Sequence, residues 1–200
     1  MAKYLEHIDP YFKEKITFTE DKLADFDAVI ATGSNNTARY FEYYFKNKPN
    51  IIRKSRNSVA VLTGKESDLD LEKLSEDIFN YFGLGCRSVS KLYVPKGYNF
   101  NAFFNGMYNK REIINNAKYA NNYDYNKAVY LMSEFDLLEN GFLMIKEDES
   151  YSSPIATIFY EYYENEGALK SKLEEDKDKI QCIVSNGFIA NEIAFGETRP

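Results

Sequence analysis

Asp27-Ala-Val-Ile-Ala-Thr-Gly-Ser-Asn-Asn-Thr-Ala-Arg-Tyr-Phe41 is the stretch that decides the fold class of this chain. Its first half is a short apolar run of β character, and its second half has a helical pattern that continues to about Phe45. The two halves meet at Gly33, where Ser34 or Asn35 can cap the helix. The stretch therefore predicts a strand, a glycine turn and a helix in direct succession.

The rest of the chain alternates between the same two kinds of element. Further strands are predicted at 49–52, 58–62, 91–94, 142–145, 155–162 and 180–184. Helices are predicted within 1–15, as a short helix that ends near Asp9-Pro10, at 70–82, at 166–177 and, with breaks at Asn115-Asn116 and Asn121-Asn122, at 99–136. Strands that alternate with helices predict an α/β fold with a largely parallel sheet flanked by helices.

The composition excludes several classes of function. The net charge of the 200 residues is −6, and a general nucleic-acid-binding protein needs a basic face, so we expect no nucleic-acid partner. One compact basic cluster, Arg53, Lys54 and Arg56, is compatible either with a phosphate pocket or with a solvated turn.

Cysteine and histidine usage limits the chemistry further. The chain has two cysteines and one histidine, which is neither a disulfide framework nor a Cys/His cluster, so we expect no metal site. His7 lies near the terminus and is a poor candidate for a catalytic base. Neither a signal peptide nor a long apolar stretch is recognised, which favours a cytoplasmic location and no membrane span.

The turn Thr32-Gly33-Ser34 has two interpretations. At a junction of strand and helix, backbone N–H groups and the helix dipole favour an anion such as a phosphate, and glycine allows a close approach. The sequence contains neither a GxGxxG nor a Walker motif there, so an ordinary capped helix explains the same residues.

Cys86, in Tyr81-Phe-Gly-Leu-Gly-Cys-Arg-Ser-Val-Ser90, is the best candidate for a reactive group. Gly83 and Gly85 open the chain between an apolar helical stretch and a strand, where another molecule can reach the thiol, and a thiolate is a good nucleophile. The competing interpretation is a small buried hydrophobic residue. Cys182, inside Ile-Gln-Cys-Ile-Val, is predicted to belong to the core.

The order of these motifs is similar to that of the aldehyde dehydrogenase superfamily, with a Thr-Gly-Ser turn followed by a cysteine after a long helix. The stretches 27–41 and 81–92 resemble the LuxC-type long-chain acyl-CoA reductases more closely. The stretch Phe195-Gly-Glu-Thr-Arg-Pro200 resembles the start of that family's C-terminal Phe-Gly motif. The resemblance extends over essentially the whole chain and is specific around Gly33 and Cys86.

The resemblance implies a reaction. A long-chain acyl-CoA would acylate Cys86 and release CoA, and NADPH would deliver hydride so that a fatty aldehyde leaves. Thr32, Gly33 and Ser34 match the turn that faces the cofactor, and the Cys86 N–H matches one donor to the oxyanion. Relatives with this architecture form dimers or larger oligomers, so a homo-oligomer is a further expectation.

Two departures from the family pattern affect these expectations. Hydrolytic relatives carry a glutamate base after the turn and its helix, but the stretch 51–58 has no carboxylate, which favours thioester reduction over acid formation. The cofactor-gripping Glu-x-Phe-Gly-Pro motif is altered to Glu149-Ser-Tyr-Ser-Ser-Pro154, so Glu149 is left out of the expected site.

The length of the chain suggests a fragment. The resemblance assigns residues 1–46 to the end of a nucleotide-binding domain and 47–200 to the catalytic domain, so we expect weak NADPH binding and little activity by this chain alone. A non-catalytic α/β binding or assembly domain, with Cys86 structural, is the alternative function.

Overall fold

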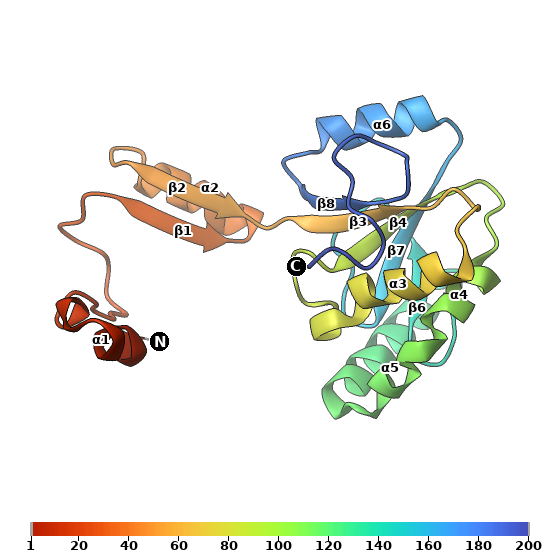
Figure 1. Ribbon diagram of the computed structural model, residues 1–200, viewed down its shortest axis with the longest axis horizontal. Coiled ribbons are helices and arrows are strands. Elements are labelled where there is room, and N and C mark those ends of the chain that lie inside the picture. The colour runs from red at the N-terminus through yellow and green to blue at the C-terminus, as the bar shows by residue number, and fades with distance from the viewer. Residues whose placement is uncertain (1, 200) are drawn as a thin grey trace. The chain divides into compact units, whose positions relative to one another are not determined.

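The computed structural model describes residues 2–199, and the chain divides into two compact units, Met1–Arg53 and Lys54–Pro200 (Figure 1). The predicted assignment of 1–46 to a nucleotide-binding domain and 47–200 to a catalytic domain stays a prediction. No helix within residues 2–199 is long and apolar enough to cross a membrane.

The first unit contains the predicted strand, turn and helix. Its elements are α1 (Ala2–Ile8), the 3₁₀ turn η1 (Pro10–Phe12), β1 (Val29–Gly33), α2 (Asn35–Tyr44) and β2 (Asn50–Lys54), and β1 pairs with β2. Ser34 caps α2, because its Oγ accepts a hydrogen bond from the Thr37 N–H at 3.2 Å. A Cβ at Gly33 would lie 2.9 Å from Thr37 Cγ2, so this close approach by itself favours glycine.

The second unit is built on a six-stranded sheet in the order β5-β6-β7-β4-β3-β8. The β5–β6 pair is antiparallel and the other four pairs are parallel, which confirms the predicted α/β fold with a largely parallel sheet. The strands are β3 (Asn57–Val61), β4 (Val89–Pro95), β5 (Leu137–Glu139), β6 (Met144–Glu147), β7 (Thr157–Tyr163) and β8 (Ile180–Val184).

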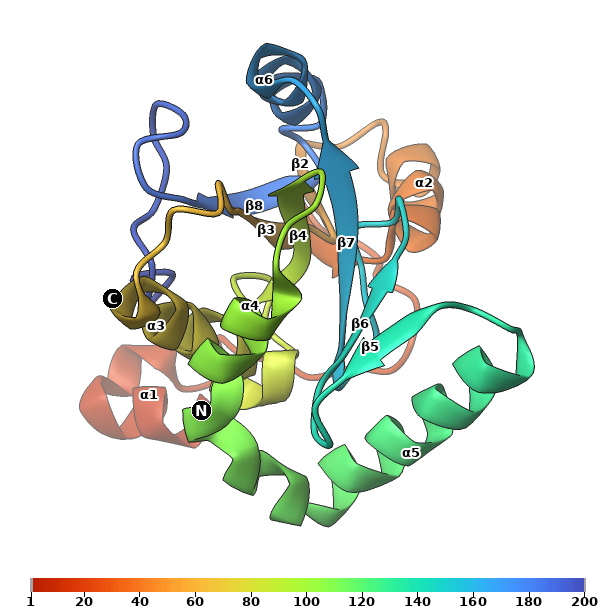
Figure 2. The ribbon, with the colours of Figure 1, turned by 90° about the vertical axis from the view of Figure 1, so that its right-hand side faces the viewer.

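Helices cover both faces of this sheet (Figure 2). Alternate residues of β3 point to opposite faces: Ala60 belongs to one apolar cluster, and Val59 and Val61 belong to the other. The first cluster is closed by α3 (Asp68–Phe79), α4 (Phe100–Met107) and α5 (Ala117–Met132), and the second by α6 (Glu166–Glu175). Burial on both faces explains why the central strands are continuous apolar runs.

Three details differ from the sequence-based prediction. Asn121 and Asn122 do not break a helix, because the Asn122 side chain donates to the Lys118 carbonyl within a continuous α5. The helix predicted over 70–82 ends at Phe79, where the irregular turn η2 (Asn80–Gly83) begins. The short edge strand β5 was not predicted. The other predicted break, at Asn115-Asn116, is present between the 3₁₀ segment η3 (Tyr108–Asn115) and α5.

Gly106 sets the distance between α3 and α4. A Cβ at this position would lie 2.5 Å from Leu71 Cβ and 2.9 Å from the Leu71 carbonyl carbon, which is backbone and cannot rotate away. We expect Gly106→Ala to lower the free energy of unfolding by about 1–3 kcal/mol, as overpacking does. Urea unfolding tests this value. The neighbouring substitution Asn105→Ala, at an exposed position of α4, is the control and should change stability by less than about 0.5 kcal/mol.

Candidate functional site

Cys86 lies on a turn between η2 and β4, at the amino end of the parallel strands. We call Gly85–Ser88 the Cys86 turn. The thiol is exposed, so the interpretation of Cys86 as a buried packing residue is wrong, whereas Cys182 is buried as predicted. The Cys86 carbonyl accepts a 2.9 Å hydrogen bond from Ser58 Oγ, and the Ser88 N–H donates to the Gly85 carbonyl at 2.9 Å.

The backbone N–H and the carbonyl of Cys86 differ in their hydrogen bonding. Within residues 2–199 the N–H donates to no acceptor, while the carbonyl of the same residue is held by Ser58. A free backbone N–H next to a thiol can stabilise negative charge that develops on an oxygen atom of a group bound to that thiol. The geometry is therefore compatible with the oxyanion role expected for this N–H.

The backbone that leads into the turn is strained. Tyr81, Phe82 and Gly83 have φ angles of +55°, +60° and +74°, so three consecutive residues are left-handed. This conformation costs a non-glycine residue about 1–2 kcal/mol. The Tyr81 and Phe82 side chains are also exposed. Contacts elsewhere must compensate this cost if the turn is to keep one conformation.

One source of such contacts is the segment Phe195–Arg199, which we call the C-terminal strap. Phe195 is buried in the core, and the Asp77 carboxylate on α3 accepts hydrogen bonds from the Gly196 N–H (2.7 Å), the Thr198 N–H (3.1 Å) and Thr198 Oγ1 (2.7 Å). Burial raises the pKa of Asp77, and these hydrogen bonds oppose that shift. Asp77 therefore ties the strap to α3.

The strap in turn contacts the Cys86 turn through the two residues after the cysteine. Arg87 Nε donates to the Thr198 carbonyl, and Arg199 Nη2 donates to Ser88 Oγ at 2.8 Å. The Arg199 guanidinium also lies over the Tyr81 ring, 4.1 Å from its centroid. A Cβ at Gly85 would come within 2.6 Å of Arg199 Nη2, so glycine leaves room for this guanidinium.

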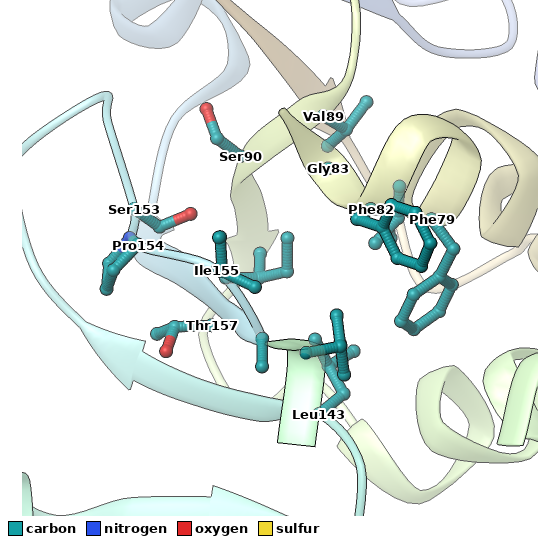
Figure 3. Close-up of a pocket in the computed structure, with 14 residues that line it drawn as sticks. Phe79, Phe82, Gly83, Val89, Ser90, Leu143, Ser153, Pro154, Ile155 and Thr157 are labelled. Carbon is teal, nitrogen blue, oxygen red and sulfur yellow. The ribbon is translucent and has the colours of Figure 1, made fainter. Parts of the chain in front are cut away.

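A small apolar pocket adjoins the turn (Figure 3). Phe79 and Phe82 lie on one side of it, and Pro154 and Ile155 lie on the other. None of the residues Gly85–Ser88 lines this pocket, but Gly83 and Val89, which lie on either side of the turn in the sequence, do. Its walls are mostly apolar, with the hydroxyl side chains of Ser90, Ser153 and Thr157 among them.

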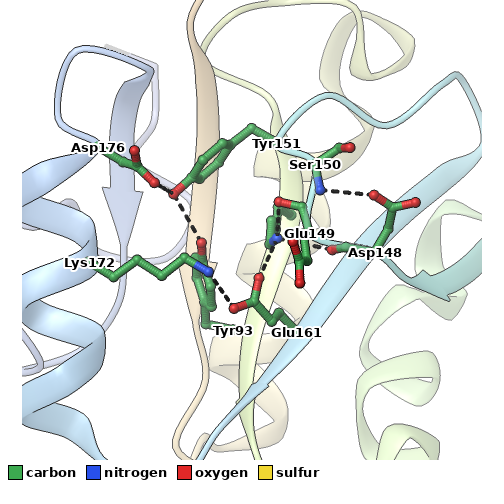
Figure 4. A network of polar contacts seen from close by, with 9 residues as sticks. Tyr93, Asp148, Glu149, Ser150, Tyr151, Glu161, Lys172 and Asp176 are labelled. Atoms are coloured by element: carbon green, nitrogen blue, oxygen red, sulfur yellow. Dashed lines mark hydrogen bonds and ion pairs between the residues drawn. The ribbon is translucent and has the colours of Figure 1, made fainter.

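A network of polar contacts holds the loop around Glu149 (Figure 4). Lys91 on β4 is 0% exposed, and its Nζ donates to Glu161 Oε2 (2.8 Å) and to the backbone carbonyls of Asp148 (3.0 Å) and Glu149 (2.7 Å). Burial lowers the pKa of Lys91, and the Glu161 carboxylate opposes the shift. Glu161 is shared with Lys172 of α6. The lysine therefore couples the central sheet to the loop around Glu149.

The network continues from the loop through the side chains of Tyr151, Tyr93 and Asp176. Tyr151 Oη lies 3.1 Å from Tyr93 Oη and donates to Asp176 Oδ2 at 2.6 Å. Glu149 is exposed, and Lys91 contacts its backbone carbonyl and not its carboxylate. This geometry is compatible with the prediction that Glu149 is not part of the cofactor site.

Asp148 makes the stability of this loop depend on acid. Burial alone would raise the pKa of Asp148, but the Lys146 ammonium and the Ser150 N–H lower it to about 2. A carboxylate with a lowered folded-state pKa stabilises the fold fully above its unfolded pKa, and this contribution declines below that value and is lost as the pH falls through the folded pKa of about 2. We expect Asp148→Asn to cost up to ~2 kcal/mol at pH 6 and less than half as much at pH 2.5.

Urea unfolding of both proteins between pH 2.5 and 6 checks the dependence on Asp148. The exposed Asp178 is the matched control, and Asp178→Asn should leave the pH profile unchanged. A constant difference between wild type and Asp148→Asn across this pH range would contradict the account.

The other predicted site residues lie in or next to the first unit. Thr32, Gly33 and Ser34 form the end of β1 and the cap of α2, where Thr32 and Ser34 are exposed. They occupy the amino end of a helix, as the sequence predicts, and their role towards a cofactor stays a prediction. Of the basic cluster, Arg53 and Lys54 end β2 and Arg56 follows two residues later, all three with exposed side chains.

Sequence reasoning missed Asp77, Ser58 and Arg199, although one signal was present. Asp77 adjoins Ile78 and lies three residues after Leu74, within the apolar pattern of α3. A charged residue at a core position of an amphipathic helix needs a polar partner, and this rule could have singled it out.

Solved structures share this architecture. An NAD-dependent aldehyde dehydrogenase from Sinorhizobium meliloti superposes with a TM-score of 0.56 at 12% identity over 84% of this chain and 42% of its own. Aldehyde dehydrogenase 21 from Physcomitrella patens, in complex with succinate, superposes with a TM-score of 0.55 at 13% identity over 80% and 39%. The chain has an aldehyde dehydrogenase-like fold.

Further comparisons define the extent of that likeness. An indole-3-acetaldehyde dehydrogenase in complex with NAD⁺ gives a TM-score of 0.54 at 12% identity over 80% of this chain. The chain spans about 40% of the length of these structures. No protein-family model and no curated protein sequence matches it. At these identities the likeness establishes the fold, and the activity has to be argued from the site.

Proposed function

We propose that this chain carries the catalytic cysteine of an oxidoreductase that reduces an acyl-CoA thioester to the aldehyde, with Cys86 as the acyl acceptor. The observation that supports this most is the exposed Cys86 thiol on a turn where the Cys86 N–H donates to no acceptor within residues 2–199. The aldehyde dehydrogenase-like fold and the resemblance to LuxC-type reductases agree with it.

The chemistry assigns two roles to Cys86. Its thiolate attacks the thioester carbonyl carbon, the bond from that carbon to the CoA sulfur breaks, and CoA leaves as a thiolate that takes up a proton. The acyl group is then bonded to Cys86 Sγ. The Cys86 N–H donates to the carbonyl oxygen when negative charge develops there, and the Ser58 hydroxyl holds the peptide in place through the Cys86 carbonyl.

The absence of a carboxylate in the stretch 51–58 supports reduction rather than hydrolysis. Hydrolysis of an acyl-cysteine needs a base that activates water, and without one the acyl group stays on Cys86 until hydride reaches its carbonyl carbon. Reduction by hydride followed by loss of the Cys86 thiolate gives the aldehyde.

A nicotinamide cofactor, NADPH in this proposal, would supply the hydride when bound. The residues that we propose to face it are Thr32, Gly33 and Ser34. They fit this role in part, because they present an exposed turn at the amino end of a ten-residue helix. Gly33 is also needed for packing against Thr37, so its presence alone does not argue for a cofactor.

Release of CoA tests the proposal without any cofactor. The chain is mixed with excess long-chain acyl-CoA, and free CoA thiol is measured over time. We expect a burst that approaches one CoA per chain, because transfer to Cys86 needs no hydride. A chain that releases no CoA above the rate of buffer hydrolysis would contradict the acyl-acceptor role.

A further inference from the structure

We propose that Asp77 is a positioning residue for Cys86 and that it acts through the C-terminal strap. The inference rests on the proposed function in one respect, namely that Cys86 accepts the acyl group. It assigns a role in acyl transfer to the Asp77 carboxylate on α3 and to Thr198. Neither residue lies in the stretch 81–90 that contains Cys86.

The first step is the partner set of Asp77. This side chain sits on α3 within a row of core residues and is 2% exposed, and its three hydrogen bonds from Gly196 and Thr198 all come from the strap. An aspartate buried at such a position is costly unless its oxygen atoms are satisfied. An apolar side chain at this position would pack α3 against the core at lower cost. We therefore assign to the Asp77 carboxylate the role of holding the strap.

The second step is the connection from the strap to the turn. Thr198 accepts from Arg87 through its carbonyl, and Arg199 donates to Ser88 while it covers the Tyr81 ring. The two turn residues contacted, Arg87 and Ser88, directly follow Cys86. The residue that binds Asp77 twice, Thr198, is thus the same residue that receives Arg87.

The third step is why the turn needs such support. Tyr81 and Phe82 are left-handed, and the Tyr81 side chain is 73% exposed, so the backbone that presents Cys86 needs support from outside the turn. Acyl transfer requires the thiol and its N–H to be held within about 0.5 Å of the productive geometry. A displacement of about 1 Å costs on the order of 100-fold in rate.

The test compares Asp77→Asn with Thr198→Val and Thr198→Ser. Asp77→Asn weakens the three hydrogen bonds, Thr198→Val removes only the hydroxyl, and Thr198→Ser keeps the hydroxyl and should restore wild-type behaviour. Glu76→Gln, at the preceding position of α3, is the matched control because Glu76 pairs with Lys110 and not with the strap.

The first readout is hydrogen exchange at the Ser88 amide, which closes the Cys86 turn. We expect exchange at least 10-fold faster in Asp77→Asn and about 3-fold faster in Thr198→Val, with unchanged amides in β4. The buried Cys182 reports global unfolding and should stay inaccessible to a thiol reagent in each variant. This pairing separates a loosened turn from a destabilised fold.

The second readout is the rate of CoA release. We expect Asp77→Asn to lower the maximal rate 10- to 100-fold while the acyl-CoA concentration for half-maximal rate changes less than 3-fold, and Glu76→Gln to match wild type.

Unchanged Ser88 exchange in folded Asp77→Asn would overturn the inference, as would an unchanged maximal rate of CoA release. If Asp77→Asn does not fold, the Thr198 pair decides in the same way. A wild-type chain that releases no CoA overturns the proposed function, while the exchange readout still decides whether the strap orders the turn.

Discussion

Cys86→Ala should reduce the release of CoA from acyl-CoA by at least ~10³-fold, to the rate of the uncatalysed reaction. The reason is that the thiol is the acceptor atom itself, and removal of a nucleophile leaves only binding and oxyanion contacts. Cys86→Ser keeps the shape and the N–H but presents a much weaker nucleophile, so it should lose nearly as much. Stopped-assay measurement of free CoA over several hours gives the required range.

The control for this substitution is Cys182→Ala. Cys182 is the other free thiol, and it is buried in β8, so it separates loss of the acceptor from loss of a cysteine in general. Cys182→Ala should retain CoA release within about 3-fold, although it leaves a small cavity and lowers stability by about 1 kcal/mol. If the two alanine variants lose activity equally, Cys86 is not the acceptor.

Lys91→Met should lower the free energy of unfolding by about 3–5 kcal/mol, the usual loss when one partner of a buried ion pair is removed. Methionine fills much of the volume of the lysine stem but donates no hydrogen bonds. It therefore leaves the Asp148 and Glu149 carbonyls without the ammonium and leaves Glu161 with Lys172 alone. Urea unfolding followed by circular dichroism measures the loss.

Lys172→Met is the comparison for this prediction. Lys172 pairs with the same carboxylate, but its side chain is 38% exposed, so its removal should cost less than about 1 kcal/mol. Equal losses in the two variants would mean that burial of Lys91 does not matter. A stable Lys91→Met protein would mean that the loop around Glu149 is held by other contacts.

The elements that could be predicted from the sequence are those that depend on local pattern. The strand, turn and helix around Gly33 follow from an apolar run, a glycine and a capping serine, and the structure contains all three. The exposure of Cys86 follows from the glycines on its approach. In contrast, β5 has three residues, and only its pairing with β6 defines it.

Much of the candidate site could not be predicted because it depends on contacts distant in sequence. Asp77 bonds residues 119 and 121 positions away, and Arg87 bonds Thr198 across 111 positions. The left-handed Tyr81 and Phe82 contradict local preference, which favours glycine for such angles. The general rule for open α/β sheets places ligands at the carboxyl ends of the strands, whereas the Cys86 turn lies at the amino end of β4.

The measurement that tests the central claim most directly is the location of the acyl group. The chain is incubated with palmitoyl-CoA, quenched in acid and digested, and the peptides are examined by mass spectrometry. The account predicts one palmitoyl group in thioester linkage on Cys86, which hydroxylamine removes at neutral pH. An acyl group found on Cys182 or on a lysine instead, or no acyl group on the peptide that contains Cys86, would contradict it.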